Sequence, residues 1–199
     1  MMMQQPLLKN NYYPIYREEI GTGDAAIFKT VNHMKRIINY DSHEPVVINF
    51  AYQIIEGAIT PFEKIQAIFE WVRDNLKYIK DGTLSQIIKS NAIMYGDFFN
   101  NSAGVEVLTS PKFLIEEFLR GKQPTEDCDG FSTLIATLLK ILGIKVKLKI
   151  ISVRSNLTFS HVYPLAWDNN QWLALDAIKK EFFIGKEPKN ITRQFEVEL

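Results

Sequence analysis

Apolar residues recur at helical spacing through most of the first 142 positions. Ile27, Val31, Met34 and Ile38 lie on one face of a predicted helix that opens at Gly21-Thr22-Gly23-Asp24. Pro45 begins a second apolar helix that runs to about Gly57. The third helix has the clearest start, because Thr60-Pro61-Phe62-Glu63 combines an N-cap, a proline at the first helical position and a glutamate three residues after the cap.

Two further helices are predicted before the period changes. Ser110-Pro111 caps a short helix that ends at Arg120-Gly121. Residues 127–142 are rich in leucine and isoleucine at helical spacing, and Gly143 closes this helix. Between these helices and the third one, residues 84–95 favour another helix followed by a loop.

After Gly143 the apolar positions alternate with polar ones. Val146, Leu148 and Ile150 alternate with lysines, which predicts a half-exposed strand. Residues 159–166 and 172–177 are predicted as two more strands, joined by Asp168-Asn169-Asn170-Gln171. Helices followed by an antiparallel sheet make an α+β fold.

Charge and composition exclude several classes of protein. Lys+Arg and Asp+Glu both number 23, so no bulk electrostatic attraction to nucleic acid or to an anionic membrane is expected. The first residues lack the basic and apolar regions of a secretory signal. No apolar run reaches the roughly 20 residues that cross a bilayer. We therefore expect neither a nucleic acid nor a membrane partner, and a cytoplasmic location, or a virion-associated one if the protein is of phage origin.

Cys128 is the single cysteine and lies at the start of the predicted helix 127–142. Backbone N–H groups and the positive end of the helix dipole favour a thiolate at such a position. The neighbouring carboxylates of Glu126, Asp127 and Asp129 act in the opposite direction. Activation of this thiol therefore requires a basic partner.

His161 is the candidate partner, and Asp176 the candidate acid behind it. With Asn169-Asn170 as a two-residue hairpin loop, Asp168 pairs with Gln171, and His161 then faces Ile178. Asp176 lies two residues away on the same face of the sheet, within reach of a histidine side chain. A slip of one residue would place the two on opposite faces.

Each of these residues also has an ordinary structural interpretation. A lone cysteine at a helix start is often a small core residue, and His161 and Asp176 are compatible with a strand histidine and a turn acceptor. A metal site would have to combine the triad with Asp127 and Asp129, but the usual ligand spacing is missing. We predict no metal and no cofactor, and solvent-facing positions for His33 and His43.

Four segments in this order resemble the transglutaminase-like core, a papain-like fold. They are Ile68-Phe69-Glu70-Trp71-Val72, Glu126-Asp127-Cys128-Asp129-Gly130-Phe131, Ser160-His161-Val162-Tyr163 and Trp172-Leu173-Ala174-Leu175-Asp176. The resemblance implies N-terminal helices followed by an antiparallel sheet packed on the cysteine-bearing helix. It also implies that Cys128 is the nucleophile, His161 the general base and acid, and Asp176 the orienting carboxylate.

Two residues depart from the family pattern. Glu126 stands where the family often has glycine, and Gly130 where a second acidic residue is common. We expect an N-terminal arm at 1–20 and a single domain at 21–199, with a core at about 60–180. Residues 83–104 are longer than the usual link and are interpreted as a lid or insertion.

The resemblance implies a cysteine-nucleophile acyl-transfer enzyme, a peptidase or amidase in preference to a cross-linking enzyme, with a protein or peptide substrate. Gly21-Thr22-Gly23-Asp24 and Val105-Glu106-Val107-Leu108 are similar to the bacterial and phage-associated branch. The alternative is therefore a catalytically idle structural or docking component of a phage particle, with other phage structural proteins as partners. An arylamine-type acetyltransferase shares the residue order, but no basic signature for coenzyme A is present.

Overall fold

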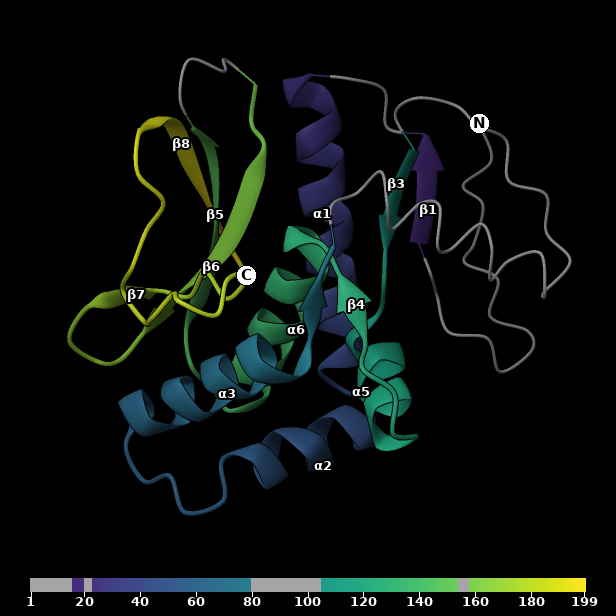
Figure 1. Ribbon diagram of the computed structural model, residues 1–199, viewed down its shortest axis with the longest axis vertical. Helices are drawn as coiled ribbons and strands as arrows, with labels where there is room; N and C mark the ends of the chain where they lie inside the picture. Colours follow the sequence, from purple (N-terminus) through teal and green to yellow (C-terminus); the bar gives the residue numbers. More distant parts are fainter. Residues whose placement is uncertain (1–15, 20–22, 80–104, 154–157) are drawn as a thin grey trace, which may run out of the picture.

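The computed structural model describes residues 16–19, 23–79, 105–153 and 158–199. Its helices, with the labels of Figure 1, are α1 (Asp24–Asp41), α2 (Pro45–Ile54), α3 (Pro61–Asn75), α5 (Pro111–Leu119) and α6 (Cys128–Ile141). Its strands are β1 (Tyr16–Glu19), β2 (Lys77–Tyr78), β3 (Val105–Leu108), β4 (Thr125–Glu126), β5 (Val146–Val153), β6 (His161–Trp167), β7 (Trp172–Ala174) and β8 (Ile191–Glu198). The predicted helix at 84–95 and the lid or insertion at 83–104 lie outside the described residues.

The helices begin where the sequence predicts. Gly23 precedes α1 with a φ of 78°, in the left-handed region that glycine adopts without strain. The start of α3 is a capping box, because the Glu63 N–H donates to Thr60 Oγ1 at 3.2 Å and the Thr60 N–H donates to Glu63 Oε2 at 2.8 Å. These predictions are confirmed.

The cap of α5 differs from the prediction. Ser110 precedes the helix but does not cap it with its own side chain. Its hydroxyl instead donates to Asp41 Oδ2 at 2.6 Å, and the same oxygen accepts the Lys112 N–H at 2.9 Å. The carboxyl group at the end of α1 therefore caps α5 across the chain. Burial raises the pKa of Asp41, although both donors oppose this shift.

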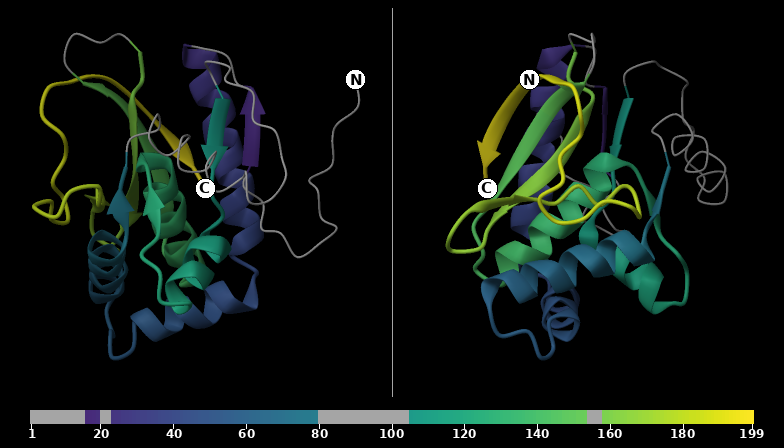
Figure 2. Two further views of the ribbon diagram at one scale, coloured as in Figure 1. Left: turned by 45° about the vertical axis from the view of Figure 1, so that its right-hand side comes forward. Right: turned by 60° about the vertical axis from the view of Figure 1, so that its left-hand side comes forward.

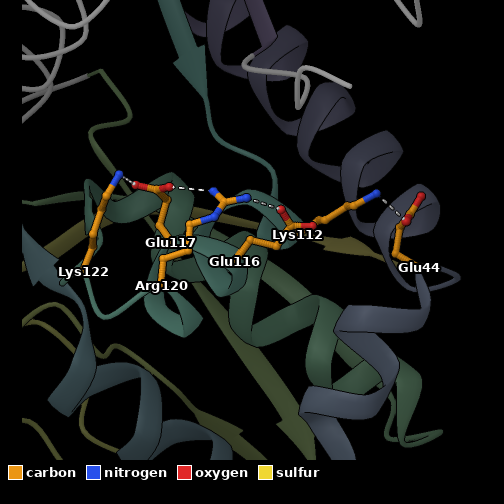
Figure 3. Close-up of polar contacts among 6 residues, drawn as sticks. All are labelled: Glu44, Lys112, Glu116, Glu117, Arg120 and Lys122. Carbon is orange, nitrogen blue, oxygen red and sulfur yellow. Dashed lines mark hydrogen bonds and ion pairs between the residues drawn. The ribbon is translucent and has the colours of Figure 1, made fainter. Parts of the chain in front are cut away.

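Ion pairs run along the outer side of α5 (Figure 3). Lys112 Nζ contacts Glu44 at 2.8 Å, which joins α5 to the residue before α2. Arg120 contacts both Glu116 and Glu117, and Lys122 also contacts Glu117. Such partly exposed pairs contribute little free energy individually, so we assign the attachment of α5 mainly to the Asp41 cap and the apolar core.

Helix α6 lies at the centre of the molecule. Figures 1 and 2 show the four-stranded sheet on one side of it and the other helices around its remaining faces. Ten consecutive residues of α6, from Gly130 to Leu139, are buried. A helix that is apolar almost all round is one that is enclosed by other elements. The predicted α+β class, with an antiparallel sheet packed on the cysteine-bearing helix, is confirmed.

The order of the strands in the main sheet is β7-β6-β5-β8, with all neighbours antiparallel. Strand β8 was not predicted, since no element was expected after residue 177. It covers one edge of β5, so β5 is an inner strand. The prediction of a half-exposed strand is wrong for Lys149, which is 7% exposed. Its ammonium group pairs with Glu187 from the loop before β8.

Two short pairings complete the fold. Residues 16–19, at the end of the predicted N-terminal arm, form β1 antiparallel to β3, and the preceding residues lie outside the described part. Strands β2 and β4 pair in parallel, with Tyr78 opposite Glu126. None of the helices in the described ranges is long and apolar enough to cross a membrane.

Candidate active site

The start of α6 carries the proposed nucleophile. Asp127 is its N-cap, because Oδ1 accepts the N–H of Asp129 at 3.0 Å and that of Gly130 at 3.3 Å. The Asp127 side chain is buried, and its negative charge lies at the positive end of the helix dipole. This carboxylate therefore stabilises the start of α6.

The Cys128 thiol is partly buried and lies 3.6 Å from Asp129 Oδ1, to which it donates. A carboxylate at this distance favours the protonated thiol, since a thiolate would face a like charge. The need for a basic partner, inferred from the sequence, is therefore greater. A thiolate forms here only if a base takes the thiol proton and becomes a cation beside the sulfur.

Glu126 does not add a third negative charge at neutral pH. Its side chain is completely enclosed, and burial raises its pKa to about 8, although hydrogen bonds with Thr109 and with the Asp127 N–H act in the opposite direction. The carboxyl group is therefore mostly protonated at pH 7. Of the three acidic neighbours predicted to oppose activation, this one is largely neutral.

The strand side of the site has the predicted register. Strand β6 pairs with β7 so that Leu165 faces Ala174 and Trp167 faces Trp172. Asn169 has a φ of 78°, and Asp168 Oδ1 accepts the N–H groups of Asn170 and Gln171, both at 2.8 Å. This hairpin prediction is confirmed in its loop and in the register of these pairs. The predicted strand at 172–177 is too long, because β7 ends at Ala174, and the ladder stops at Leu165 before it reaches His161 and Ile178.

The register brings His161 and Asp176 together. His161 Nε2 lies 2.9 Å from Asp176 Oδ2, and Asp176 is only 1% exposed. Asp176 Oδ1 is buried and has no hydrogen-bond partner among the residues that the structure describes. The carboxyl group is thus directed at the imidazole. Since Nε2 is engaged, Nδ1 is the nitrogen left to accept a proton from another group.

Ser132 connects the two sides. Its hydroxyl lies 2.7 Å from the Cys128 carbonyl oxygen and 3.0 Å from the Val162 carbonyl oxygen. One buried donor therefore joins the first turn of α6 to the residue that follows His161. Ser132 was not singled out from the sequence. Its position four residues after Cys128 places it on the same face of the helix, which is the signal that could have found it.

A second polar cluster lies behind the imidazole. The Tyr163 ring is 5.6 Å from the His161 ring, and its hydroxyl donates to Glu187 Oε1 at 2.9 Å. The same oxygen accepts from Lys149, whose ammonium group also lies over the Tyr163 ring. Burial and the neighbouring Glu187 raise the pKa of Tyr163, so its hydroxyl acts as a donor. This cluster fixes the loop that follows Asp176 against the sheet.

The remaining predictions about titratable residues have mixed outcomes. Among the residues that the structure describes, no three histidine, cysteine or acidic side chains are grouped so as to hold a metal ion. His43 is exposed, as predicted, with Nδ1 2.7 Å from the Asn39 carbonyl oxygen. The prediction for His33 is wrong, because this residue of α1 is 7% exposed. Its position on the apolar face of that helix places it toward the core.

Three solved structures show low similarity to this chain. A proposed cysteine protease from Cytophaga hutchinsonii is 20% identical, with a TM-score of 0.43 over 66% of this chain and 36% of its own. A proposed protease from Parabacteroides distasonis is 15% identical, with a TM-score of 0.46 over 76% and 26%. A TGase is 13% identical, with a TM-score of 0.39 over 86% and 37%. The chain thus spans well under half the length of these structures.

The comparison with curated proteins gives no match. A sequence profile described as the transglutaminase-like superfamily matches residues 48–177. This match covers more than half of the chain and includes the helix start at Cys128, the strand at His161 and the residue Asp176. The phage-associated branch is tested by none of these comparisons and stays a prediction. The chain belongs to the transglutaminase-like superfamily.

Proposed function

We propose that the chain is a cysteine-nucleophile acyl-transfer enzyme that hydrolyses a peptide or side-chain amide bond. Cys128 is the nucleophile, His161 the general base and acid, and Asp176 the residue that orients the imidazole. The observation that carries the proposal is the 2.9 Å contact between His161 Nε2 and Asp176 Oδ2. The residue after His161 is Val162, and the Ser132 hydroxyl joins its carbonyl oxygen to that of Cys128.

The proposed reaction begins with transfer of the thiol proton to His161 Nδ1. The sulfur attacks the substrate carbonyl carbon, the C–N bond breaks, and the imidazolium gives its proton to the departing amine. The product of this step is a thioester on Cys128. A water molecule, deprotonated by His161, then attacks the thioester, the C–S bond breaks, and the carboxylic acid leaves while the thiol is restored.

The Asp176 carboxylate supports both steps by stabilising the imidazolium and by fixing its orientation. The Asp127 cap occupies the N–H groups of Asp129 and Gly130. We propose the Cys128 N–H as a donor to the oxyanion that forms during attack, since it lies at the start of the helix beside the sulfur. An amine that replaces the water would make the same intermediate into a cross-link.

Alkylation kinetics test the proposal directly, because Cys128 is the only cysteine and every alkylation reports on it. We expect the native protein to react with iodoacetamide below pH 7, and His161→Ala to react there about 100-fold more slowly, as an ordinary thiol of pKa about 8.5 would. His43→Ala is the matched control, since it removes an exposed histidine and should leave the rate unchanged. A thiol that reacts only after unfolding would refute the enzyme proposal.

Product analysis separates hydrolysis from cross-linking. The active protein is incubated with a mixture of unfolded proteins, with and without an added primary amine, and the products are analysed by mass spectrometry. New peptide termini or deamidated glutamines support hydrolysis, whereas isopeptide bonds or incorporated amine support cross-linking. Cys128→Ala is the control for each product and should give neither.

A further inference from the structure

The two departures from the family pattern meet in one place beside Cys128. A Cβ atom added at Gly130 would lie 2.3 Å from Glu126 Oε2 and 2.7 Å from both Cδ and Cγ of the same side chain. Carbon atoms do not approach so closely without a shift of one partner. The Glu126 side chain thus occupies the space into which any side chain at position 130 would project.

Glu126 is held in this place from several directions. Its carboxyl group hydrogen-bonds with the buried Thr109, which follows β3, and with the Asp127 N–H. Its carbonyl oxygen accepts the Ile79 N–H at 2.9 Å, next to the pairing of β2 with β4. Because the side chain is fully enclosed, it could make room for a larger residue 130 only by giving up these contacts.

We propose that Glu126 is a positioning residue for Cys128, which it serves by packing over Gly130 and by linking the first turn of α6 to Thr109. The inference rests on the proposed function only in taking Cys128 as the nucleophile. Glu126 acts through the helix turn that carries the thiol, and we assign it no contact with substrate.

The contact with Thr109 extends to the first helix. The next residue, Ser110, donates to Asp41 Oδ2 at 2.6 Å, at the end of α1. Two adjacent residues therefore connect two buried carboxyl groups, one at the start of α6 and one at the end of α1. This link explains how a segment that is distant in sequence, at 109–110, can set the position of the nucleophile.

The protonation state of Glu126 suits a positioning role. Burial raises its pKa to about 8, so at pH 7 the group is mostly a neutral acid that both donates and accepts. The titratable neighbours on the adjoining elements are Asp127, Asp129 and Cys128 itself, together with Tyr78 on the paired strand. A glutamine has nearly the same size and can also donate and accept, whereas an alanine does neither.

The test compares alkylation rates of Cys128 across pH 6 to 9 in Glu126→Gln and Glu126→Ala, with thermal unfolding as the control for folding. We expect Glu126→Gln to react within about twofold of the native protein. Glu126→Ala should react about tenfold more slowly at pH 6.5, with its rate profile displaced to higher pH, because a misplaced thiol loses its base. A structural role alone would lower the unfolding temperature and leave the pH profile in place.

A second set of variants tests the shared space from Gly130, and its first member keeps the native Glu126. Gly130→Ala should slow alkylation by about tenfold in the native background. Added to Glu126→Gly, the same change should alter the rate by no more than about twofold, since the obstructing side chain is absent. Equal effects of Gly130→Ala in both backgrounds would overturn the inference.

The two proposals fail in different ways. If alkylation of the native protein does not depend on His161, the proposed function is wrong. If it does depend on His161, while Glu126→Ala keeps the native rate and pH profile, only the positioning role is wrong.

Discussion

Asp176 and Glu126 are both buried carboxyl groups beside the proposed reaction centre, yet their surroundings are opposite. Asp176 contacts an imidazole at 2.9 Å, a partner that becomes a cation when it accepts a proton. Glu126 contacts a threonine hydroxyl and a backbone N–H, and neither of these can become charged. The first environment suits an ion pair, whereas the second raises the pKa of the acid to about 8 and favours its neutral form.

The difference teaches that burial alone does not define the role of an acid in this site. An isosteric exchange of carboxyl for amide removes a charge at one position and changes little at the other. The same substitution at Asp176 and at Glu126 should therefore separate a residue that acts through its charge from one that acts through its shape and hydrogen bonds.

The largest effect is expected from Asp176. Asp176→Ala removes both the charge and the hydrogen bond to His161, and alkylation of Cys128 at pH 6 should slow about 100-fold. Asp176→Asn keeps an acceptor in place but loses the charge, so we expect it to slow the reaction about tenfold. Rates of iodoacetamide labelling, measured with equal amounts of folded protein, check this order.

Asp168→Asn is the matched control, because it changes a half-buried turn aspartate at the other end of the same hairpin and keeps its Oδ1 acceptor. It should leave the labelling rate unchanged. If Asp176→Ala labels as fast as the native protein, the contact with His161 has no part in activating the thiol, and the comparison with Glu126 loses its basis.

The sequence predicted the Asp176 side of the site because its contacts are local. His161 and Asp176 are 15 residues apart, and one turn at Asn169-Asn170 sets the register of the hairpin from which both residues extend. The Thr60 capping box and the start of α6 were predictable for the same reason, since a cap depends on neighbouring residues. Each of these predictions required only the period of the chain and the chemistry of a short segment.

The Glu126 side depends on contacts that no local pattern contains. Nothing in the sequence around Glu126 indicates that Thr109 is its partner, or that Gly130 leaves space for its side chain. The sequence could show only that both residues depart from the family pattern. The burial of Lys149 was missed for a similar reason, because it depends on Glu187 and on strand β8, which follow much later in the chain.

The next largest effect concerns the cluster behind His161. Glu187→Ala leaves the buried Lys149 ammonium group and the Tyr163 hydroxyl without their shared acceptor. A buried pair that loses one partner is destabilised by 3–5 kcal/mol, and because Glu187 is about one-third exposed we expect about 2 kcal/mol. Urea unfolding measures this change.

Glu181→Ala, an exposed substitution in the same loop, is the control and should have almost no effect on stability. The labelling rate of Cys128 should change far less in Glu187→Ala than in Asp176→Ala. A larger effect on labelling than on unfolding would mean that the loop, and not the hairpin, determines the orientation of His161.

Glu126 should leave a signature in the pH dependence of stability. Its pKa is raised from 4.5 to about 8 in the folded protein, so its neutral form stabilises the fold below about pH 4.5, and this contribution is lost as the pH rises toward 8. The native free energy of unfolding should therefore fall over this range relative to Glu126→Gln, by at most about 1.4 kcal/mol per pH unit. Asp41, whose pKa is also raised, is present in both proteins and cancels in the difference.

Urea unfolding at several pH values between 5 and 8 gives this difference. If the free energies of unfolding of the native protein and of Glu126→Gln change in parallel with pH, Glu126 is ionised over the whole range. Its neighbours would then have to stabilise a buried negative charge. The contrast with Asp176 would disappear in that case, because both acids would carry a charge within the same buried site.

Ser132 tests whether the two sides of the site act as one unit. Its hydroxyl is shared between the carbonyl groups of Cys128 and Val162, so Ser132→Ala removes one donor from both the helix and the strand. We expect a loss of about 1 kcal/mol in the free energy of unfolding and an approximately threefold slower labelling of Cys128.

Thr137→Val is a matched control, because the buried Thr137 hydroxyl donates within α6 to the Thr133 carbonyl oxygen at 2.7 Å. A similar loss of stability in both variants, with slower labelling in Ser132→Ala alone, would assign the effect to the link between helix and strand, since only Ser132 spans the two. If both variants label at the native rate, the nucleophile and its base are positioned independently, by Glu126 on one side and by the hairpin on the other.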